Sequence, residues 1–377
     1  MSAQPPEPMS VCRITLQKNQ VASIAYMGGT FITTSTSQIY LAMAPSSTRA
    51  VPVVPHQGDN IAYLAPSQLE VYAYRKSRIV DYTLDDADLE TRCPLDNGRH
   101  LIPPQDSLGQ LDMLPLELLT CIFLTLDLPL LTIFRRVNRR AMCLVDSLHQ
   151  YQMVLKHCPN VLRAITSIDA RYFDCRTLYK TLSTTKCEAC DRFGGYLYLI
   201  TCKRVCYFCF TLNPDYLPVS ATRAAKHLGL PRKEIKHLPH ILSLPGKYTA
   251  FGKLSRNRIT LFDRQAVLKS TLKTSTLAID DSIRQQDLTT RGPRRHMSII
   301  SAPCFGSSGL SADWGFYCAG CRESKELEKN LRNKYTANGI VDHIRRYGTV
   351  MVVDQQIKHT LTPDNLNLIP PPFSPKH

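Results

Sequence analysis

The sequence contains none of the short motifs that mark the common classes of enzyme. It has no glycine-rich phosphate loop, no G-x-S-x-G and no H-E-x-x-H. No pair of acidic residues stands in a recognisable catalytic frame. The eleven histidines are scattered along the chain, and each is interpreted as a surface or packing residue rather than a base. We therefore expect a non-catalytic protein.

Signals for secretion and for membrane insertion are also missing. The N-terminus, MSAQPPEPMS, has no basic start followed by an apolar run. The most apolar window, Leu118 to Phe134, is interrupted by Asp127 and Pro129 and falls short of the roughly 20 residues that a membrane span requires. We therefore expect a protein of the cytoplasm or nucleus, with no membrane partner. Its cysteines are then reduced, which favours metal binding over disulfides.

Length and charge set the remaining bounds. At 377 residues and 44% hydrophobic, the chain is long enough for two or three packed domains, and its 25 prolines indicate several irregular connections. The formal net charge of +15 favours acidic partners, either nucleic acid or an acidic protein surface. Charge alone does not choose between them.

Cysteine is abundant, and five of the fourteen lie in one short stretch. Cys187 and Cys190 form one C-x2-C pair and Cys206 and Cys209 form a second, separated by fifteen residues with a Gly-Gly turn and a strand-like run. This is the spacing of a structural zinc site with four thiolates and no open position for catalysis. A disulfide cluster would suit a secreted chain, and a redox C-x-x-C would require a βαβ context that is missing here.

A third C-x2-C pair, Cys318 and Cys321, leaves two arrangements open. In one, the pair meets Cys202 and one further ligand, Cys304 or a histidine, in a second zinc site. In the other, the pair replaces the Cys206 pair in a single site. We prefer the local pairing for the first site, because closing a loop of over a hundred residues costs more chain entropy. A charged helix is expected after Cys321, ending at Gly339.

Residues 111–148 predict three short helices. Pro115 suits the first turn of a helix that carries apolar residues on two sides. Leu118 and Ile122 lie on one stripe, with Leu126, and the opposite stripe includes Leu119 and Phe123. One face can pack on neighbouring helices, so the other must be covered by something else. A second helix is expected at 130–134, and a third has an apolar stripe formed by Val137, Ala141, Leu144, Val145 and Leu148.

At these residues the sequence resembles an F-box. The matching positions are Leu114, Pro115, Glu117, Leu118, Leu119, Ile122, Leu126, Leu128, Leu131, Val137 and Leu144 to Ser147. Ala141 stands where many F-boxes have tryptophan. Together with the cysteine stretch, the chain up to about residue 245 is similar to a fungal family in which an F-box precedes helices and a zinc-binding region.

This resemblance implies binding to the Skp-type adaptor of a cullin-RING ubiquitin ligase, while other regions recruit an unknown protein substrate. The partner-binding residues it implies are Leu114, Pro115, Glu117, Leu118, Ile122, Leu126, Leu128 and Val137. The alternative is that residues 111–148 are simply a helical hairpin of the core.

After the first cysteine stretch comes a basic pair of predicted helices, the first at 221–228 and the second opened by Pro231. Their candidate nucleic-acid contacts are Arg223, Lys226, Arg232 and Lys233. With the cysteines, this region loosely resembles the DNA-binding part of the xeroderma pigmentosum group A repair protein, on the matched residues Cys187, Cys190, Cys206, Cys209, Ala225, Lys226, Leu230 and Leu238. A stripe that tracks phosphates and an ordinary solvated face both remain open.

The predicted architecture is α+β, a helical F-box followed by a small zinc-stabilised α+β domain. Residues 1–105 form a β-prone or partly disordered segment that ends in a solvated linker at 83–104, and 108–150 form the F-box. A helical connector (151–185), the zinc module with its basic helices (186–245), an irregular insertion (246–303), the last C-x2-C with a helix (304–350) and a flexible tail (351–377) follow. The expected function is substrate recognition within a ubiquitin ligase. A zinc-dependent nucleic-acid-binding protein and a structural scaffold are the alternatives.

Overall fold

The computed structural model describes most of the chain between residues 69 and 359. The described residues are 15–16, 20–21, 69, 72–75, 79–95, 104, 107–228, 235–274, 292–306, 311–323, 330–347, 350–353 and 356–359. The chain divides into two compact units, Met1–Val53 and Val54–His377. The described part of the first unit is an antiparallel pair of strands, β1 (Thr15–Leu16) and β2 (Gln20–Val21).

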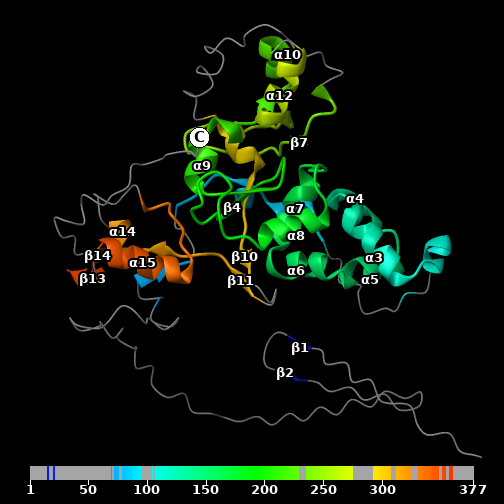
Figure 1. Ribbon diagram of the computed structural model, residues 1–377, viewed down its shortest axis with the longest axis horizontal. Helices are drawn as coiled ribbons and strands as arrows, with labels where there is room; N and C mark the ends of the chain where they lie inside the picture. The colour runs from blue at the N-terminus through cyan, green and yellow to red at the C-terminus, as the bar shows by residue number, and fades with distance from the viewer. Residues whose placement is uncertain are drawn as a thin grey trace, which may run out of the picture. The chain divides into compact units, whose positions relative to one another are not determined.

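The second unit combines helices with several small antiparallel sheets (Figure 1), which confirms a mixed α+β class. Its helical part opens with the 3-10 turn η3 (Gly109–Met113). The helices that follow are α3 (Leu116–Thr125), α4 (Leu128–Arg135), α5 (Arg139–Ser147), α6 (His149–His157), α7 (Pro159–Ser167) and α8 (Cys175–Leu182). Helix α4 contacts α5 and α7, and α3 contacts α8.

Side-chain caps set where three of these helices begin. Asp127, Asn138 and Asp174 each accept a hydrogen bond, of 2.7 to 2.8 Å, from the backbone N–H three residues later. The Asn138 cap excludes Val137 from α5, and Val137 is 64% exposed. Val137 therefore lies outside the helix whose apolar stripe it was predicted to join, whereas Ala141 and Val145 of that stripe are fully buried.

The cysteine-rich stretch folds around a three-stranded sheet. Strand β4 (Tyr196–Tyr198) pairs with β5 (Lys203–Val205) on one side and with β9 (Ile299–Ser301) on the other. Strand β9 comes from the predicted irregular insertion, and Ile299 and Ile300 are fully buried. The C-terminal end of that insertion is therefore a packed part of the sheet, because its two isoleucines complete the same apolar layer as β4. Nearby lie α9 (Tyr207–Leu212) and two 3-10 turns, η4 (Pro214–Tyr216) and η5 (Pro293–Ser298).

One continuous hydrophobic core joins the helices to this sheet. It includes Leu119 and Phe123 of α3, Leu178 of α8, and Leu197 of β4. The predicted F-box, helical connector and zinc module thus share a single core.

The predicted solvated linker at 83–104 is wrong over its described N-terminal part. It forms a 3-10 turn, η2 (Leu84–Asp86), and a short helix, α2 (Leu89–Arg92), which contacts α7. Leu84 and Leu89 are buried in the main core, and Asp85 accepts hydrogen bonds from the backbone N–H (2.7 Å) and hydroxyl (2.8 Å) of Ser301. The acidic residues that suggested solvation face outward or hold β9, while the leucines between them pack.

A smaller α+β part follows the first cysteine stretch. Its sheet has the order β6 (Val219–Ser220), β8 (Thr260–Phe262), β7 (His240–Leu242), and it carries α10 (Ala221–Leu228) and α12 (Arg264–Thr274). A separate apolar cluster holds these elements together, with Val219, Ala224, Phe262 and Val267 among its members. Helix α10 spans the range predicted from the sequence.

The C-terminal part has its own small core. Strand β12 (Tyr317–Cys318) pairs with β3 (Ala73–Tyr74), and α14 (Ala319–Glu323) and α15 (Ala337–Tyr347) follow. The remaining strands form two hairpins, β10 (Cys304–Phe305) with β11 (Ala312–Asp313) and β13 (Val350–Val353) with β14 (Gln356–His359).

Two expectations are corrected in this part. Gly339 lies in the first turn of α15 instead of ending a helix, because Thr336 accepts a hydrogen bond from its N–H and starts the helix there. The described residues between 351 and 359, placed in a flexible tail, form most of the last hairpin. In the described part of the second unit, none of the helices has the length and apolar character needed to cross a bilayer.

Candidate metal centres and an exposed helical face

Two Cys/His clusters in the second unit could each hold a metal ion. In the first, the sulfurs of Cys187, Cys190, Cys206 and Cys209 all lie within 4.8 Å of one another. The Sγ atoms of Cys190 and Cys206 are 3.6 Å apart. Four thiolates at about 2.3 Å from a central zinc ion would be separated by about 3.8 Å, so these sulfurs lie close enough together to surround one zinc ion. The structure brings together the four residues that the sequence predicts.

Local backbone geometry aims these sulfurs inward. Asp191 takes a left-handed conformation (φ 57°), and Cys187 donates a backbone hydrogen bond of 2.7 Å to Arg192, so the chain turns tightly around the first pair. On the other side, Cys206 caps α9 and its sulfur accepts a hydrogen bond from the Cys209 N–H at 3.4 Å. A tight turn and a helix start therefore present two sulfurs each.

The proximity of the four thiols couples their ionisation. Hydrogen bonds from Cys190, then Cys206 and Cys209, lower the pKa of the Cys187 thiol far below its ordinary value. The same contacts, led by Cys187, raise the pKa of Cys209. The cluster thus accepts a first negative charge readily and resists the later ones. A divalent cation at the centre would offset that resistance.

The second cluster consists of Cys318, Cys321, His343 and His359, all of them buried. Cys318 Sγ lies 3.1 Å from His359 Nε2, and Cys321 Sγ lies 3.2 Å from His343 Nε2. The four ligand atoms again fall within 4.8 Å of one another. Two sulfurs and two imidazole nitrogens are a donor set that suits zinc.

The surroundings of the second cluster are shaped for this convergence. A Cβ on Gly320 would come within 2.7 Å of the His359 ring, so the glycine between the two cysteines lets that imidazole approach. His343 projects from the apolar face of α15, between Ile340 and Tyr347, where its Nδ1 is buried with no hydrogen-bond partner. A buried imidazole that uses only Nε2 is well explained as a ligand.

Sequence reasoning identified half of this second set. Cys318 and Cys321 were predicted as a ligand pair, but Cys202 lies outside both clusters, where its sulfur is 3.7 Å from the Thr181 hydroxyl. Burial raises the pKa of Cys202 to about 12, so it remains a protonated packing residue. Cys304 is likewise outside both clusters, in β10.

The sequence did not single out His343 and His359 as candidate ligands. The signal in the sequence was that His343 lies at the centre of an apolar helical stripe. It also follows the third C-x2-C pair, which still lacked two ligands. His359 carried no signal of its own, because its place depends on the last hairpin. The thirteen cysteines in the described part form no disulfides with one another.

Arg204 holds the first cluster's surroundings together from within the core. It is 2% exposed, and its guanidinium donates to the carbonyl oxygens of Thr181 (3.0 Å), Gly194, Leu182 (3.3 Å) and Pro303 (2.6 Å). Gly194 is required here, since a Cβ would lie 2.4 Å from Arg204 Cγ. The arginine therefore ties α8 and the cysteine turn to the segment after β9.

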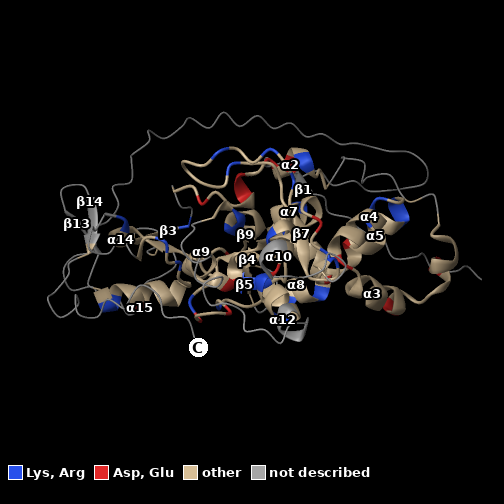
Figure 2. Cartoon of the chain, turned by 90° about the horizontal axis from the view of Figure 1, so that it is seen from above, with Lys and Arg blue, Asp and Glu red and all other residues tan. Residues whose placement is uncertain are grey.

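A different candidate site lies on α3, whose two faces differ sharply. Leu119 and Phe123 are buried in the core, while Leu118 (51% exposed) and Ile122 (44%) face outward. Figure 2 shows α3 almost free of charged residues, with Glu117 as its one acidic side chain. The sequence prediction of a helix with one packed and one uncovered apolar face is confirmed.

The other predicted partner-binding residues also divide into exposed and buried side chains. Leu114, Pro115 and Glu117 are exposed beside Leu118 and Ile122, and Val137 is exposed too. Leu126 is half-buried. Leu128 is fully buried in the core and cannot form a surface contact, because Pro129 and the Asp127 cap turn it inward at the start of α4.

The predicted nucleic-acid contacts are only partly described. Arg223 is half-buried on α10. Lys226 lies on the same helix, but its side chain, like the whole of Arg232 and Lys233, falls outside the described residues.

No protein-family model matches the sequence, and no curated protein or solved structure is significantly similar to it.

Proposed function

We propose that this chain is a non-catalytic substrate-recognition subunit of a Skp-cullin-F-box type ubiquitin ligase, stabilised by two structural zinc ions. The observation that carries the proposal is the concentration of exposed apolar side chains around α3. Among the described residues, nine of the sixteen large apolar side chains that are exposed fall between 111 and 137: Leu111, Met113, Leu114, Leu116, Leu118, Ile122, Leu130, Ile133 and Val137.

Such a concentration favours a protein partner. Large contiguous apolar patches are uncommon on monomeric proteins and mark interaction surfaces. Each leucine or isoleucine that a partner buries fully contributes about 1.5 to 3 kcal/mol, so several of them together can offset the cost of association. These exposed residues include Leu114, Leu118 and Ile122, which carry the F-box resemblance. The partner that this resemblance implies is the Skp-type adaptor.

The zinc assignment rests on the chemistry of the ligand atoms. Thiolate and imidazole donors in tetrahedral array favour zinc over magnesium or calcium, which prefer oxygen. Each cluster uses four protein ligands and offers no open position, so both ions would have a structural role.

The test is capture of a purified Skp-type adaptor by the full-length protein. Replacing Leu114, Pro115 and Leu118 together by alanine should abolish capture while two metal ions per chain are retained. Leu254→Ala removes a similarly exposed leucine outside the patch and should leave capture unchanged. Undiminished capture by the triple variant would refute the F-box assignment.

A second candidate function, nucleic-acid binding, is favoured by one specific observation. Residues 221–274 contain twelve Lys or Arg against two acidic residues, so this stretch carries +10 of the chain's net +15. Between β7 and β8, Gly246 and Ser255 exchange backbone hydrogen bonds of 3.0 and 2.9 Å. The loop that they close presents Phe251, fully exposed, beside the exposed Lys247 and Lys253.

An exposed aromatic ring flanked by cations is a suitable platform for stacking an unpaired base. Binding of a fluorescent single-stranded oligonucleotide should then weaken steeply as salt rises, because phosphate contacts release counterions. Phe251→Ala should weaken oligonucleotide binding relative to the wild type. Tyr172→Ala provides a control at another exposed aromatic residue. Absence of binding at low salt would rule out this candidate.

A further inference from the structure

The eight candidate metal ligands differ in their access to solvent. Cys190 is half-buried, whereas the other seven are buried. In the second cluster, Cys318 and Cys321 are only 3% and 1% exposed. Thiolates react with oxidants according to their accessibility, so a small solute such as hydrogen peroxide meets the first cluster at Cys190, while protein atoms cover both sulfurs of the second.

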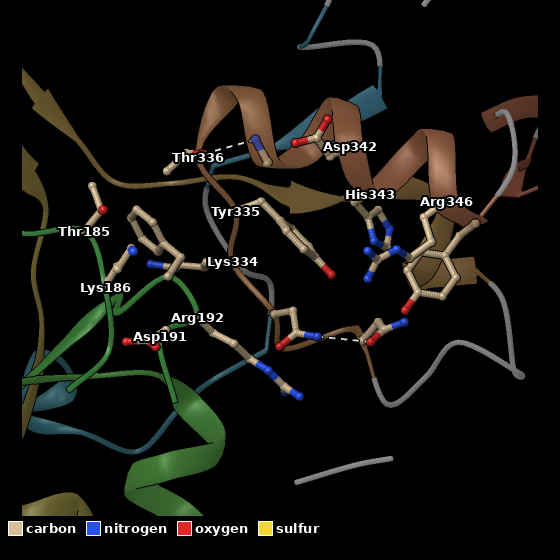
Figure 3. A pocket seen from close by; sticks show the side chains of 15 residues that line it. Thr185, Lys186, Asp191, Arg192, Lys334, Tyr335, Thr336, Asp342, His343 and Arg346 are labelled. Carbon is tan, nitrogen blue, oxygen red and sulfur yellow. Dashed lines mark hydrogen bonds between the residues drawn. The ribbon is translucent and has the colours of Figure 1, made fainter. Parts of the chain in front are cut away.

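Cys190 lies on an exposed turn that borders a cavity. Its neighbours Glu188 and Asp191 are exposed, and Asp191 and Arg192 line a cavity of about 480 Å³ (Figure 3). The opposite wall of this cavity belongs to residues 330–347. The turn is therefore bordered by open space on that side, which leaves room for it to move.

The second cluster meets the same cavity through an imidazole instead of a sulfur. His343 is part of the lining, whereas Cys318 and Cys321 are not. Peroxide oxidises thiolate sulfur, so access through the cavity does not bring the oxidant to the reactive atoms of the second cluster. The two clusters thus differ in sensitivity to an oxidant although both would hold zinc.

A second thiolate lies beside Cys190. The Sγ atom of Cys190 is 3.6 Å from that of Cys206. Sulfurs this close need only a short movement to reach the bonding distance of about 2.0 Å. Cys206 stands at the start of α9, so the pair connects the exposed turn with that helix. A sulfenic acid formed on Cys190 would therefore have a resolving thiolate next to it.

We propose that the first cluster is a peroxide-sensitive switch, in which Cys190 and Cys206 form a disulfide and zinc is released, while the second cluster keeps its ion. The Cys190 thiolate attacks one oxygen of hydrogen peroxide, and the O–O bond breaks as the S–O bond of a sulfenic acid forms. The Cys206 thiolate then attacks this sulfur, so the S–S bond forms as the S–O bond breaks. Each step releases a hydroxide that takes up one proton and leaves as water, and two electrons pass from the sulfurs to the peroxide.

The disulfide would affect the exposed face of α3 through the core. The two remaining thiolates are half of the set that a structural zinc site uses, so the ion is no longer held. Cys206 belongs to the same hydrophobic core as Leu119 and Phe123, the packed residues of α3. Adaptor capture should therefore fall on oxidation. This consequence rests on the proposed function, whereas the disulfide and the zinc release do not.

The test treats the full-length, zinc-loaded protein with hydrogen peroxide. Native mass spectrometry should show the loss of one of two zinc ions, and peptide mapping should find a disulfide between Cys190 and Cys206. A thiol reductant with added zinc should restore the second ion. Cys121 and Cys143, two exposed thiols outside both clusters, report how far oxidation has proceeded.

Three results would overturn the inference. The first is parallel loss of both ions, and the second is retention of both ions once Cys121 and Cys143 are oxidised. The third is release of zinc with a disulfide between any other pair of cysteines.

Two variants locate the sulfur that the oxidant reaches. Cys190→His keeps a zinc ligand but removes the accessible thiolate, so peroxide should release zinc about tenfold more slowly. Cys121→Ser, Cys143→Ser removes the exposed thiols outside the clusters and should leave the rate of release unchanged. Equal rates in the wild type and a Cys190→His variant that binds two ions would refute the inference. If that variant binds fewer ions, the disulfide map of the wild type decides.

Adaptor capture separates this inference from the proposed function. Reduced protein that captures the adaptor should lose capture on oxidation and regain it after reduction in the presence of zinc. Capture that survives formation of the disulfide refutes the effect on α3. Reduced protein that never captures the adaptor refutes the proposed function alone, because zinc release is measured independently.

Discussion

The two metal clusters place similar chemistry in very different surroundings. The first draws its ligands from one short stretch, and three of them, Cys187, Cys206 and Cys209, belong to the large core that also contains the α3 helix. The second gathers its residues from positions as far as 41 apart, on β12, α14, α15 and β14. Its surrounding apolar cluster is small, and its buried members include Phe316, Ile340 and Ile344.

The difference shows what each metal would have to stabilise. A small cluster buries too little apolar surface to order its own segments, so a bound ion would supply most of the ordering free energy there. At the first cluster, the ion would instead support a core that reaches from α2 to β10. Loss of the first ion should therefore affect the whole second unit, while loss of the other should remain local.

The largest effect is expected from Cys206→Ser, Cys209→Ser. Structural zinc sites contribute about 10 to 16 kcal/mol in isolated fingers, which is comparable to the entire stability of a domain, about 5 to 15 kcal/mol. This variant should lose the main cooperative unfolding transition, as followed by near-ultraviolet circular dichroism of the tyrosines packed around α9.

A retained main transition in that variant would contradict the assigned role of the first cluster. Cys121→Ser, Cys143→Ser replaces two exposed cysteines outside both clusters and is the matched control.

The second-largest effect is expected from the double variant Cys318→Ser, Cys321→Ser. Native mass spectrometry should show two zinc ions in the wild type and one in this variant, while the main unfolding transition stays within a few degrees of the wild type. Proteolysis should become faster only within residues 69–75 and 312–359, because the small core, which includes β3, depends on the second cluster. If the variant keeps every ion found in the wild type, these cysteines are not ligands.

How much of each site was predictable follows from how local it is. The Cys187 to Cys209 set could be predicted because spacing alone fixes which sulfurs can meet. The exposed stripe of α3 could be predicted from its excess of leucines. His359 could not, because its position depends on a hairpin pairing β13 with β14, and a single histidine next to a strand resembles any surface residue.

The fold, too, could be predicted from the sequence only where its contacts are local. Strand β9 and the segment from Leu84 to Leu95 belong to the main core through pairings with distant residues, such as the contact from Asp85 to Ser301. The acidic composition of residues 83–104 indicated a solvated linker, and the basic and polar composition of residues 246–303 indicated an irregular insertion. Long-range pairing overrode that local signal.

The smallest expected effect concerns the pH dependence of stability and depends on His296, which lies outside both metal clusters. His343 and His359 converge on sulfurs, whereas His296 packs its ring on Phe210 of α9 at 5.6 Å and contacts the Asp81 carbonyl oxygen at 2.9 Å. Burial, with a smaller contribution from Arg295, lowers the pKa of His296 to about 4. In the unfolded chain its pKa is about 6.5, so the unfolded state binds more protons between these values.

The contribution of His296 is therefore fully present above pH 6.5 and is lost as the pH falls toward 4. The full shift corresponds to about 3 kcal/mol, and partial exposure of the ring reduces the expected loss to about 1 to 2 kcal/mol. His296→Asn keeps an amide that can donate to Asp81 and removes the titration. Between pH 6.5 and 5, with the metal content monitored, the free energy of unfolding should fall less steeply in this variant than in the wild type. His149→Asn, at an exposed histidine on α6, should leave the slope as it is. Equal slopes in the wild type and His296→Asn would show that the main core does not depend on this neutral imidazole.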